Sequence, residues 1–271
     1  MLAIIAPGQG AQTPAMLAPW IEDAQAKELL IEWSDAIGLD LVHLGVHADA
    51  DEIKDTANAQ PLIVAAGLLS ARALGAHGKF SLVAGHSVGE ITAAAIAGVL
   101  TPLDAMKLVR QRGVEMAKAA ALKPSGMAAI LGGDREVVLA GISAAGLVAA
   151  NDNGGGQIVA AGSLDALATL APAGARVRAL AVAGAFHTNF MEPAVAPMRE
   201  LAASVSVSEP SSKILSNKDG DVVASGREVL DRIVAQIANP VRWDLCMEKL
   251  ASLGVTGAIE VAPAGTLVGL I

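Results

Sequence analysis

Short apolar runs alternate along the chain with longer segments whose apolar residues recur at helical spacing. Runs at 3–6 and 82–85 predict buried strands, and the second leads directly into a helix expected over 90–100. Further helices are expected over 60–74 and from 101 to about 121. Strands that alternate with helices predict an α/β fold built on a mainly parallel sheet covered on both faces.

The middle of the chain has a different rhythm: strand, helix, strand, strand, helix, strand. These elements are expected at 126–131, 134–145, 147–150, 157–161, 164–170 and 177–182. This succession is typical of the ferredoxin-like unit. We therefore expect an α/β body over 1–125 and 188–271, with a ferredoxin-like small subdomain inserted over 126–187.

The body resumes after the insertion with helices and short strands. They are expected at 193–203, 214–216, 229–236 and 259–261.

Composition narrows the class of protein. Hydrophobic residues make up 53% of the 271 residues, yet no run of about 18 apolar residues occurs, so no membrane span is expected. The single cysteine, Cys246, excludes an intrachain disulfide and fits a small core residue in a reducing cytoplasm. The net charge of -8 argues against non-specific binding to nucleic acid.

Ser87 lies in the motif Gly85-His86-Ser87-Val88-Gly89, between a predicted strand and a predicted helix. A sharp turn of this kind needs small residues on either side and lifts the serine hydroxyl clear of the backbone. The helix that follows offers free N–H groups to a developing oxyanion. The alternative is a Gly-rich turn with a capping serine, but the strand-to-helix context favours a nucleophile.

A nucleophilic serine needs a base within hydrogen-bond reach, and the chain has five histidines. His43 and His47 lie in a polar segment expected at the surface, and His77 in a Gly-rich loop. His86 adjoins the serine, where neighbouring side chains are expected to diverge. His187 remains, at the end of the predicted small subdomain, with a solvated loop histidine as the alternative.

The sequence does not decide which group orients the base. An ordinary choice is a carboxylate after His187, and an amide side chain or a backbone carbonyl also suffices. The candidates are Asp219, Asp221, Glu228, Asp231 and Gln236.

Two further features carry candidate chemistry. In Gly8-Gln9-Gly10-Ala11-Gln12, glycines let the backbone pass close to a ligand, and the N–H of Gln12 is a candidate for an oxyanion hole; a plain turn is the alternative. Arg112 falls on the apolar face of its helix, where a cation needs an anionic partner. That partner is either Glu115, three residues on, or a ligand carboxylate.

Together these segments resemble the malonyl-CoA:acyl carrier protein transacylases of fatty-acid synthesis, in particular the bacterial type II enzymes of actinomycetes. The resemblance covers nearly the whole chain in family order. Its blocks are 8–12, 85–90, 111–113, 185–187, 236–243 and 260–263.

The resemblance implies a hydrolase-like α/β body with a ferredoxin-like insertion. It implies Ser87 as nucleophile and His187 as base, with the N–H groups of Gln12 and Val88 in the oxyanion hole. Arg112 is then expected to bind the malonyl carboxylate. The resemblance also implies that the main-chain carbonyl of Gln236 orients the histidine and that Asn153 corresponds to a cleft-side asparagine.

The same resemblance implies a ping-pong mechanism with malonyl-CoA and acyl carrier protein as partners, serving fatty-acid or polyketide synthesis. No metal or redox cofactor is expected, since coenzyme A enters as part of the substrate. The alternatives are a serine thioesterase or hydrolase on the same scaffold and a non-catalytic protein that docks the carrier protein.

Two expectations of detail follow from the resemblance. In the family, a phenylalanine directly before the base, here Phe186, accompanies specificity for malonyl, and a smaller residue at that position accompanies specificity for methylmalonyl. Relatives continue beyond the position of Ile271 through a helix and a strand. We therefore expect the strand at 259–261 to be a partly exposed edge, and a longer form of the chain to melt at a higher temperature.

Overall fold

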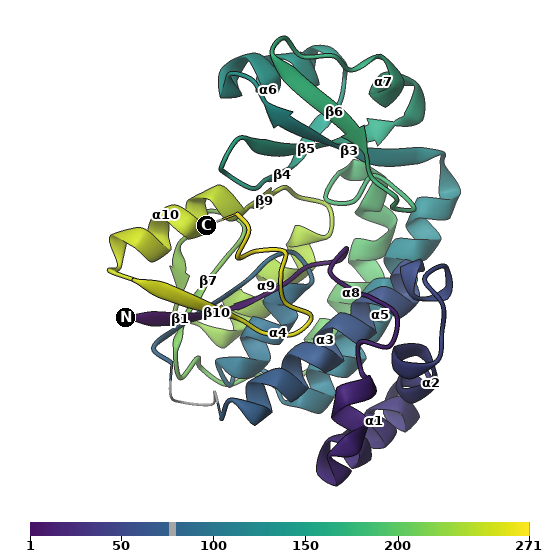
Figure 1. The fold of residues 1–271 in the computed structure, drawn as a ribbon, viewed down its shortest axis with the longest axis vertical. Coiled ribbons are helices and arrows are strands. Elements are labelled where there is room, and N and C mark those ends of the chain that lie inside the picture. Colours follow the sequence, from purple (N-terminus) through teal and green to yellow (C-terminus); the bar gives the residue numbers. More distant parts are fainter. Residues whose placement is uncertain (76–79, 271) are drawn as a thin grey trace.

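The computed structural model describes residues 1–75 and 80–270. It contains two sheets, one above the other in the view of Figure 1. His77, named above as a loop histidine, lies outside the described residues.

The body sheet has the strand order β10-β1-β2-β7-β8. Its strands are β1 (Leu2–Ala6), β2 (Leu82–Gly85), β7 (Lys213–Leu215), β8 (Val222–Val223) and β10 (Gly257–Glu260). All pairings are parallel except that of β7 with β8. The mainly parallel sheet expected from the apolar runs is confirmed, and β10 lies at its edge next to β1.

Helices pack around this sheet. They are α1 (Ala24–Ile37), α2 (Leu41–Val46), α3 (Thr56–Ala73), α4 (Gly89–Ile96), α5 (Pro102–Leu122), α8 (Glu192–Ser204), α9 (Gly226–Gln236) and α10 (Trp243–Ser252). Three 3-10 turns join them: η1 (Ala18–Glu22), η2 (Glu52–Lys54) and η3 (Asn189–Met191).

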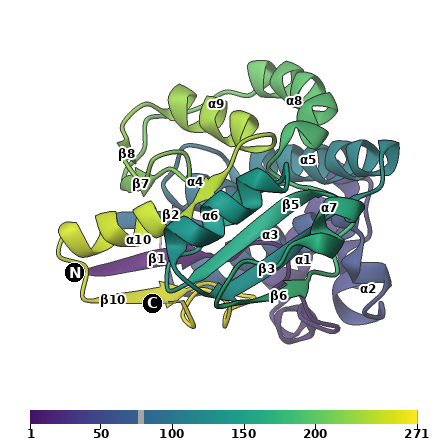
Figure 2. The ribbon, with the colours of Figure 1, turned by 90° about the horizontal axis from the view of Figure 1, so that it is seen from above.

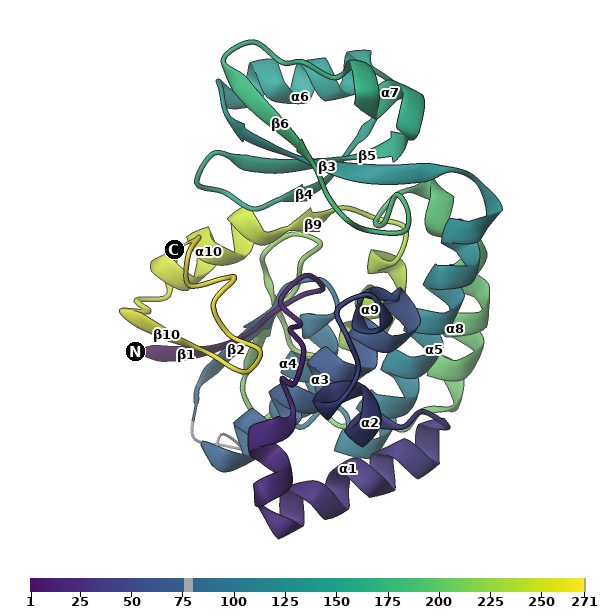
Figure 3. The same cartoon turned by 45° about the vertical axis from the view of Figure 1, so that its right-hand side comes forward.

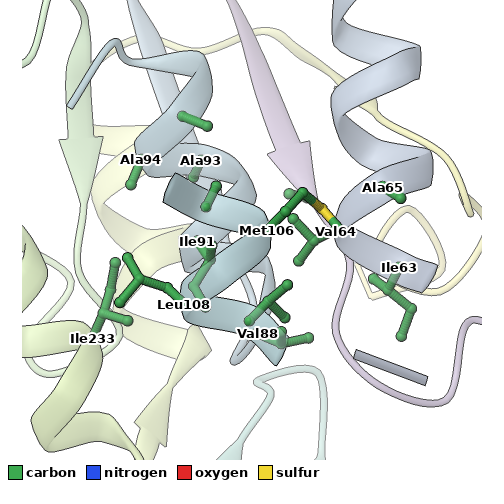
Figure 4. Close-up of a cluster of buried hydrophobic side chains, with 14 of the residues drawn as sticks. Ile63, Val64, Ala65, Val88, Ile91, Ala93, Ala94, Met106, Leu108 and Ile233 are labelled. Atoms are coloured by element: carbon green, nitrogen blue, oxygen red, sulfur yellow. The ribbon is translucent and has the colours of Figure 1, made fainter. Parts of the chain in front are cut away.

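The core of the body surrounds α4, the helix that follows the serine motif. Figure 4 shows Ile91 of α4 among Val64 of α3, Met106 and Leu108 of α5, and Ile233 of α9. All five side chains are buried. Because α4 is enclosed by apolar side chains, the turn at its N-terminus is held in a fixed position.

The small sheet has the order β6-β3-β5-β4-β9. Its elements are β3 (Ser125–Gly132), α6 (Arg135–Ala144), β4 (Val148–Asp152), β5 (Gln157–Ser163), α7 (Leu164–Thr169), β6 (Ala175–Ala179) and β9 (Val241–Arg242). Figures 1 and 3 show α6 and α7 on the face of this sheet that is turned away from the body. Viewed from above in Figure 2, both helices lie over the strands.

The succession of β3, α6, β4, β5, α7 and β6 is the one that the sequence predicts. The sheet differs in its fifth strand, β9, which comes from a distant part of the chain and pairs with β4 in parallel. The division of the chain at 126 and 187 stays a proposal. Among the described residues, no helix is both long and apolar enough to cross a membrane.

Candidate active site

Ser87 occupies the turn between β2 and α4, with a left-handed φ of 52°. Glycines on either side make this turn possible. A Cβ on Gly85 would collide with the carbonyl group of Gly89, and one on Gly89 would collide with the carbonyl oxygen of Ala6. The requirement for small residues around the serine therefore has a steric cause.

His187 reaches the serine from the segment after β6. Its Nε2 lies 2.8 Å from Ser87 Oγ, and its Nδ1 lies 2.7 Å from the carbonyl oxygen of Gln236. Because a carbonyl oxygen only accepts, Nδ1 carries the proton and donates it there. The lone pair of Nε2 then faces the serine hydroxyl, which is the arrangement a general base requires.

The carboxylates considered as orienting groups lie elsewhere. Asp219 and Glu228 pair with Arg232, and Asp221 pairs with Lys249. Asp231 is exposed. Of the open alternatives, the structure brings only Gln236 to His187, through its main-chain carbonyl.

Burial keeps His187 neutral. The pKa of His187 is lowered to about 3, chiefly by burial and next by the positive charge of Arg112. At neutral pH the imidazole is therefore uncharged and free to accept a proton from Ser87.

Arg112 is fully buried on α5 and points at the same hydroxyl. Its Nη2 lies 3.4 Å from Ser87 Oγ and donates to Gln236 Oε1 at 2.9 Å, and its Nη1 donates to Gln60 Oε1 at 2.8 Å. Burial lowers the pKa of Arg112 to about 10, which leaves the guanidinium charged at neutral pH. Its hydrogen-bond partners are neutral oxygens, so no carboxylate among the described residues pairs directly with this cation.

The structural alternative for Arg112, a pair with Glu115, is wrong. Glu115 instead accepts from Gln111 at 3.0 Å and from Lys118 at 2.8 Å. Both partners lie on α5 itself. Arg112 turns away from them, toward the nucleophile.

A cleft of about 240 Å³ opens over Ser87 and His187. Phe186 and Asn153 line it, in agreement with the prediction, and Val88 is buried directly beside the serine at the N-cap of α4. The other lining residues come from the loop after β1, the serine turn, the small sheet, the segment after β6 and the C-terminal segment: Gly8, Gln9, His86, Met127, Ala129, Asn151, Gln157, Val159, Leu180, Val182, Thr266, Leu267 and Leu270.

Gln12 is absent from this lining. Its side chain instead accepts a hydrogen bond from the N–H of Gly10 at 2.7 Å, at the exposed end of the loop. The loop approaches the serine turn earlier, where a Cβ on Gly8 would lie 2.9 Å from the carbonyl oxygen of His86. Gln9 is therefore better placed than Gln12 to present an N–H beside Ser87.

His86 was considered only as a base in the sequence, and its place in the cleft was not predicted. Its side chain lines the cleft, and its Nε2 donates to Asn153 Oδ1 at 2.9 Å. The amide of Asn153 is oriented by its own donation to Gln157 Oε1 at 2.7 Å. The only signal for His86 was its place in the motif, because its partner is 67 residues away.

Comparisons with known proteins agree with this geometry. The family described as acyl transferase domain matches residues 4–270. The malonyl CoA-acyl carrier protein transacylase of Mycobacterium tuberculosis is 52% identical, over 100% of this chain and 92% of that protein. The crystal structure of MCAT from Mycobacterium tuberculosis has a TM-score of 0.97 at 51% identity, covering 100% of this chain and 92% of that one.

The chain belongs to the malonyl CoA-acyl carrier protein transacylase family. It is therefore an acyltransferase. Another structure, at 31% identity and a TM-score of 0.92, shows a type II PKS acyl-carrier protein in complex with its malonyl-transacylase; it covers 99% of this chain and 91% of that one.

Within residues 1–75 and 80–270, no group of three or more His, Cys, Asp or Glu side chains is arranged to hold a metal ion.

Proposed function

We propose that the chain transfers malonyl from malonyl-CoA to the phosphopantetheine thiol of acyl carrier protein through an acyl-enzyme on Ser87. The observation that carries the proposal is the buried cation of Arg112, 3.4 Å from the hydroxyl that His187 is placed to deprotonate. The names of the relatives and the carrier-protein complex of one of them support it.

In the first half-reaction, Ser87 Oγ attacks the thioester carbon while His187 Nε2 takes the hydroxyl proton. The tetrahedral oxyanion receives hydrogen bonds from the N–H groups of Val88 and Gln9, with Gln9 replacing Gln12 in this role. The intermediate collapses by breaking the C–S bond. The coenzyme A thiolate leaves and takes the proton back from His187.

In the second half-reaction, a thiol is the attacking group, whereas in the first the coenzyme A thiol was the leaving group. The phosphopantetheine thiol gives its proton to His187 and attacks the seryl ester, and Ser87 leaves as the restored alcohol. The main-chain carbonyl of Gln236 holds His187 in the required tautomer throughout. Every proton is carried by His187, so the steps call on no resident cofactor.

Arg112 selects the acyl group in this proposal. Malonyl differs from acetyl by one negative charge, and a guanidinium holds a carboxylate through two parallel hydrogen bonds. The Nε–H of Arg112 is buried and has no hydrogen-bond partner among the described residues. A carboxylate would satisfy that donor and neutralise the buried charge.

The proposed cellular compartment rests on the free cysteine. Cys246 is a buried free thiol, as expected, and thiols of this kind fit a reducing compartment. We place the protein in the cytoplasm.

The decisive experiment is mass spectrometry of the protein after brief exposure to malonyl-CoA, with and without holo carrier protein. We expect a malonyl adduct on Ser87 that disappears when carrier protein is added and reappears on the carrier. Ser87→Ala should form no adduct, and His187→Ala should load about 10²–10⁴-fold more slowly. An adduct that persists in Ser87→Ala, or release of free malonate in place of transfer, would contradict the proposal.

A further inference from the structure

Asn217 lies in the loop after β7, fully buried beneath the serine turn. Its Oδ1 accepts from the N–H of Ser87 at 2.8 Å, and its Nδ2 donates to the carbonyl oxygen of Gly85 at 2.8 Å. One amide thus bridges the two backbone groups on either side of His86. Among neutral side chains of this size, the amide of Asn is suited to the task because it offers a donor and an acceptor together.

The turn needs such a bridge. The ladder between β1 and β2 ends where the N–H of His86 donates to Ala6, and Ser87 then adopts its left-handed φ of 52°. Beyond that point the backbone groups have no neighbouring strand to pair with. A buried N–H left without a partner is costly, and a strained backbone persists only when its surroundings hold it.

The same amide reaches the base. Gln236 Nε2 donates to Asn217 Oδ1 at 3.0 Å, and the main-chain carbonyl of Gln236 accepts from His187. Glu90 connects the two, because its carboxyl oxygens accept from the N–H of Asn217 at 2.5 Å and from Gln236 Nε2 at 2.6 Å. Ser87 and His187 are 100 residues apart in the sequence. The buried amide of Asn217 therefore connects to both, to Ser87 directly and to His187 through Gln236.

We infer that Asn217 is a positioning residue, which fixes the hydroxyl of Ser87 relative to the imidazole of His187 without touching the substrate. The inference rests on the proposed function, since it concerns the rate at which malonyl loads onto Ser87. Losing the bridge frees the turn to relax, and a displacement of about 1 Å in a reacting group costs on the order of 100-fold in rate.

The test uses Asn217→Leu and Asn217→Asp, with single-turnover loading of Ser87 by malonyl-CoA measured at pH 5.5 and 7.5. Rates are expressed per folded protein, with folding followed by circular dichroism. We expect Asn217→Leu to load about 100-fold more slowly at both pH values, while the malonyl-CoA concentration for half-maximal rate changes little. Asn58→Asp is the control, because the Asn58 amide bonds only to Glu52 on the outside of the fold.

Asn217→Asp separates positioning from mere stability. A protonated aspartic acid keeps one donor for Gly85 and one acceptor for Ser87, whereas an aspartate presents only acceptors. Burial raises the pKa of such a carboxyl. Of the ionisable groups, Glu90 of α4 and Cys246 of α10 contact Asn217 directly, while the charges of Arg112 of α5, Asp219 and Arg232 of α9 act on Glu90.

We expect Asn217→Asp to load faster at pH 5.5 than at 7.5. The wild type should change little over this range, because His187 stays neutral throughout. A folded Asn217→Leu that loads at the wild-type rate, or an Asn217→Asp that is slower at pH 5.5 than at 7.5, would overturn the inference. Failure of the wild type to load would instead refute the proposed function.

Discussion

At the scale of single residues, the proposed role of Arg112 would link recognition of the substrate to the strength of the base. Its charge is the second cause, after burial, of the low pKa of His187. A carboxylate bound to Arg112 cancels that charge and makes the imidazole a stronger base. Malonyl would thus activate its own transfer, whereas acetyl, which has no carboxylate, would not.

The first prediction concerns Arg112→Ala. A charge-assisted hydrogen bond contributes about 1.5–3 kcal/mol, so loss of a two-bond pair should reduce the ratio of malonyl to acetyl loading by tens- to thousands-fold. Acetyl loading should be as fast as before or faster, because His187 is relieved of a neighbouring charge. Arg112→Lys should fall between the two.

The measurement is the amount of each acyl group on Ser87, with folding checked by circular dichroism. If the ratio of malonyl to acetyl loading is unchanged in Arg112→Ala, then Arg112 does not bind the malonyl carboxylate.

A second prediction concerns Phe186, which lines the cleft beside the base. A ring there crowds a methyl group added to the acyl Cα, and a methyl-sized difference in a pocket is worth about 1–3 kcal/mol. The wild type should prefer malonyl-CoA to methylmalonyl-CoA, and Phe186→Ser should relax that preference. Competition between the two substrates for Ser87 measures it; equal use of both by the wild type would count against the assignment.

The sequence identified residues whose role depends on a local motif and missed those that depend on contacts across the fold. Ser87 was found from its turn and His187 by elimination among histidines. Gln9 and Gln12 look alike in the loop, and only the approach of Gly8 to His86 distinguishes them. Asn217 had no local signal, because its partner Ser87 is 130 residues away.

At the scale of elements, the serine turn joins β2 to α4 and depends on glycine at both ends. The strand at 82–85 was predicted with its observed bounds, because an apolar run ends at a sharp turn. The two-residue β9 was not predicted, since its pairing with β4 is non-local. α1 was also missed, although Ala26, Leu30 and Trp33 are buried at helical spacing.

The third prediction tests this turn with a matched pair of glycines. Gly85→Ala places a methyl group against the Gly89 carbonyl, and strain of this kind costs about 1–3 kcal/mol or more in the free energy of unfolding. Gly141→Ala, inside α6, meets nothing closer than 3.7 Å and should stabilise by up to about 1 kcal/mol through helix propensity.

Urea denaturation measures both changes. Gly85→Ala should also slow the loading of Ser87, whereas Gly141→Ala should leave it unchanged. Equal stabilities for the two variants would show that the turn adapts more freely than its packing indicates.

At the scale of the whole molecule, the residues of the site come from both sheets. Ser87 and Arg112 belong to the body, whereas Asn153 follows β4 of the small sheet. β9 joins the two, because it pairs with β4 while the N–H of Arg242 donates to the carbonyl oxygen of Asn217 at 2.7 Å. The mainly parallel sheet of the body could be predicted from alternating patterns, but its strand order and this connection could not.

The burial of two histidines and one glutamate makes the free energy of unfolding depend on pH in two opposing ways. His187 and His86 have pKa values lowered by burial, so below pH 6.5 the unfolded chain binds protons that the folded protein does not. Stability is lost as the pH falls through that region. Glu90 acts in the other direction, because burial raises its pKa from 4.5 to about 8.

The last prediction follows from Glu90, whose contribution is separated from that of the histidines by comparing the wild type with Glu90→Gln. Up to about pH 8 the folded protein keeps a proton on Glu90 that the unfolded chain has released, so stability falls as the pH rises. Relative to Glu90→Gln, the loss from pH 6.5 to 8 should be about 1.5 kcal/mol, since each pH unit corresponds to about 1.4 kcal/mol for one proton and the folded protein has released half of it by pH 8. Urea denaturation of the wild type across this interval measures it. Glu90→Gln should flatten the dependence whatever its absolute stability, and Glu28→Gln, on the exposed face of α1, should leave it unchanged. A wild type whose pH dependence from 6.5 to 8 equals that of Glu90→Gln would mean that Glu90 is already ionised in the folded protein, held by the N–H of Asn217 and the amide of Gln236.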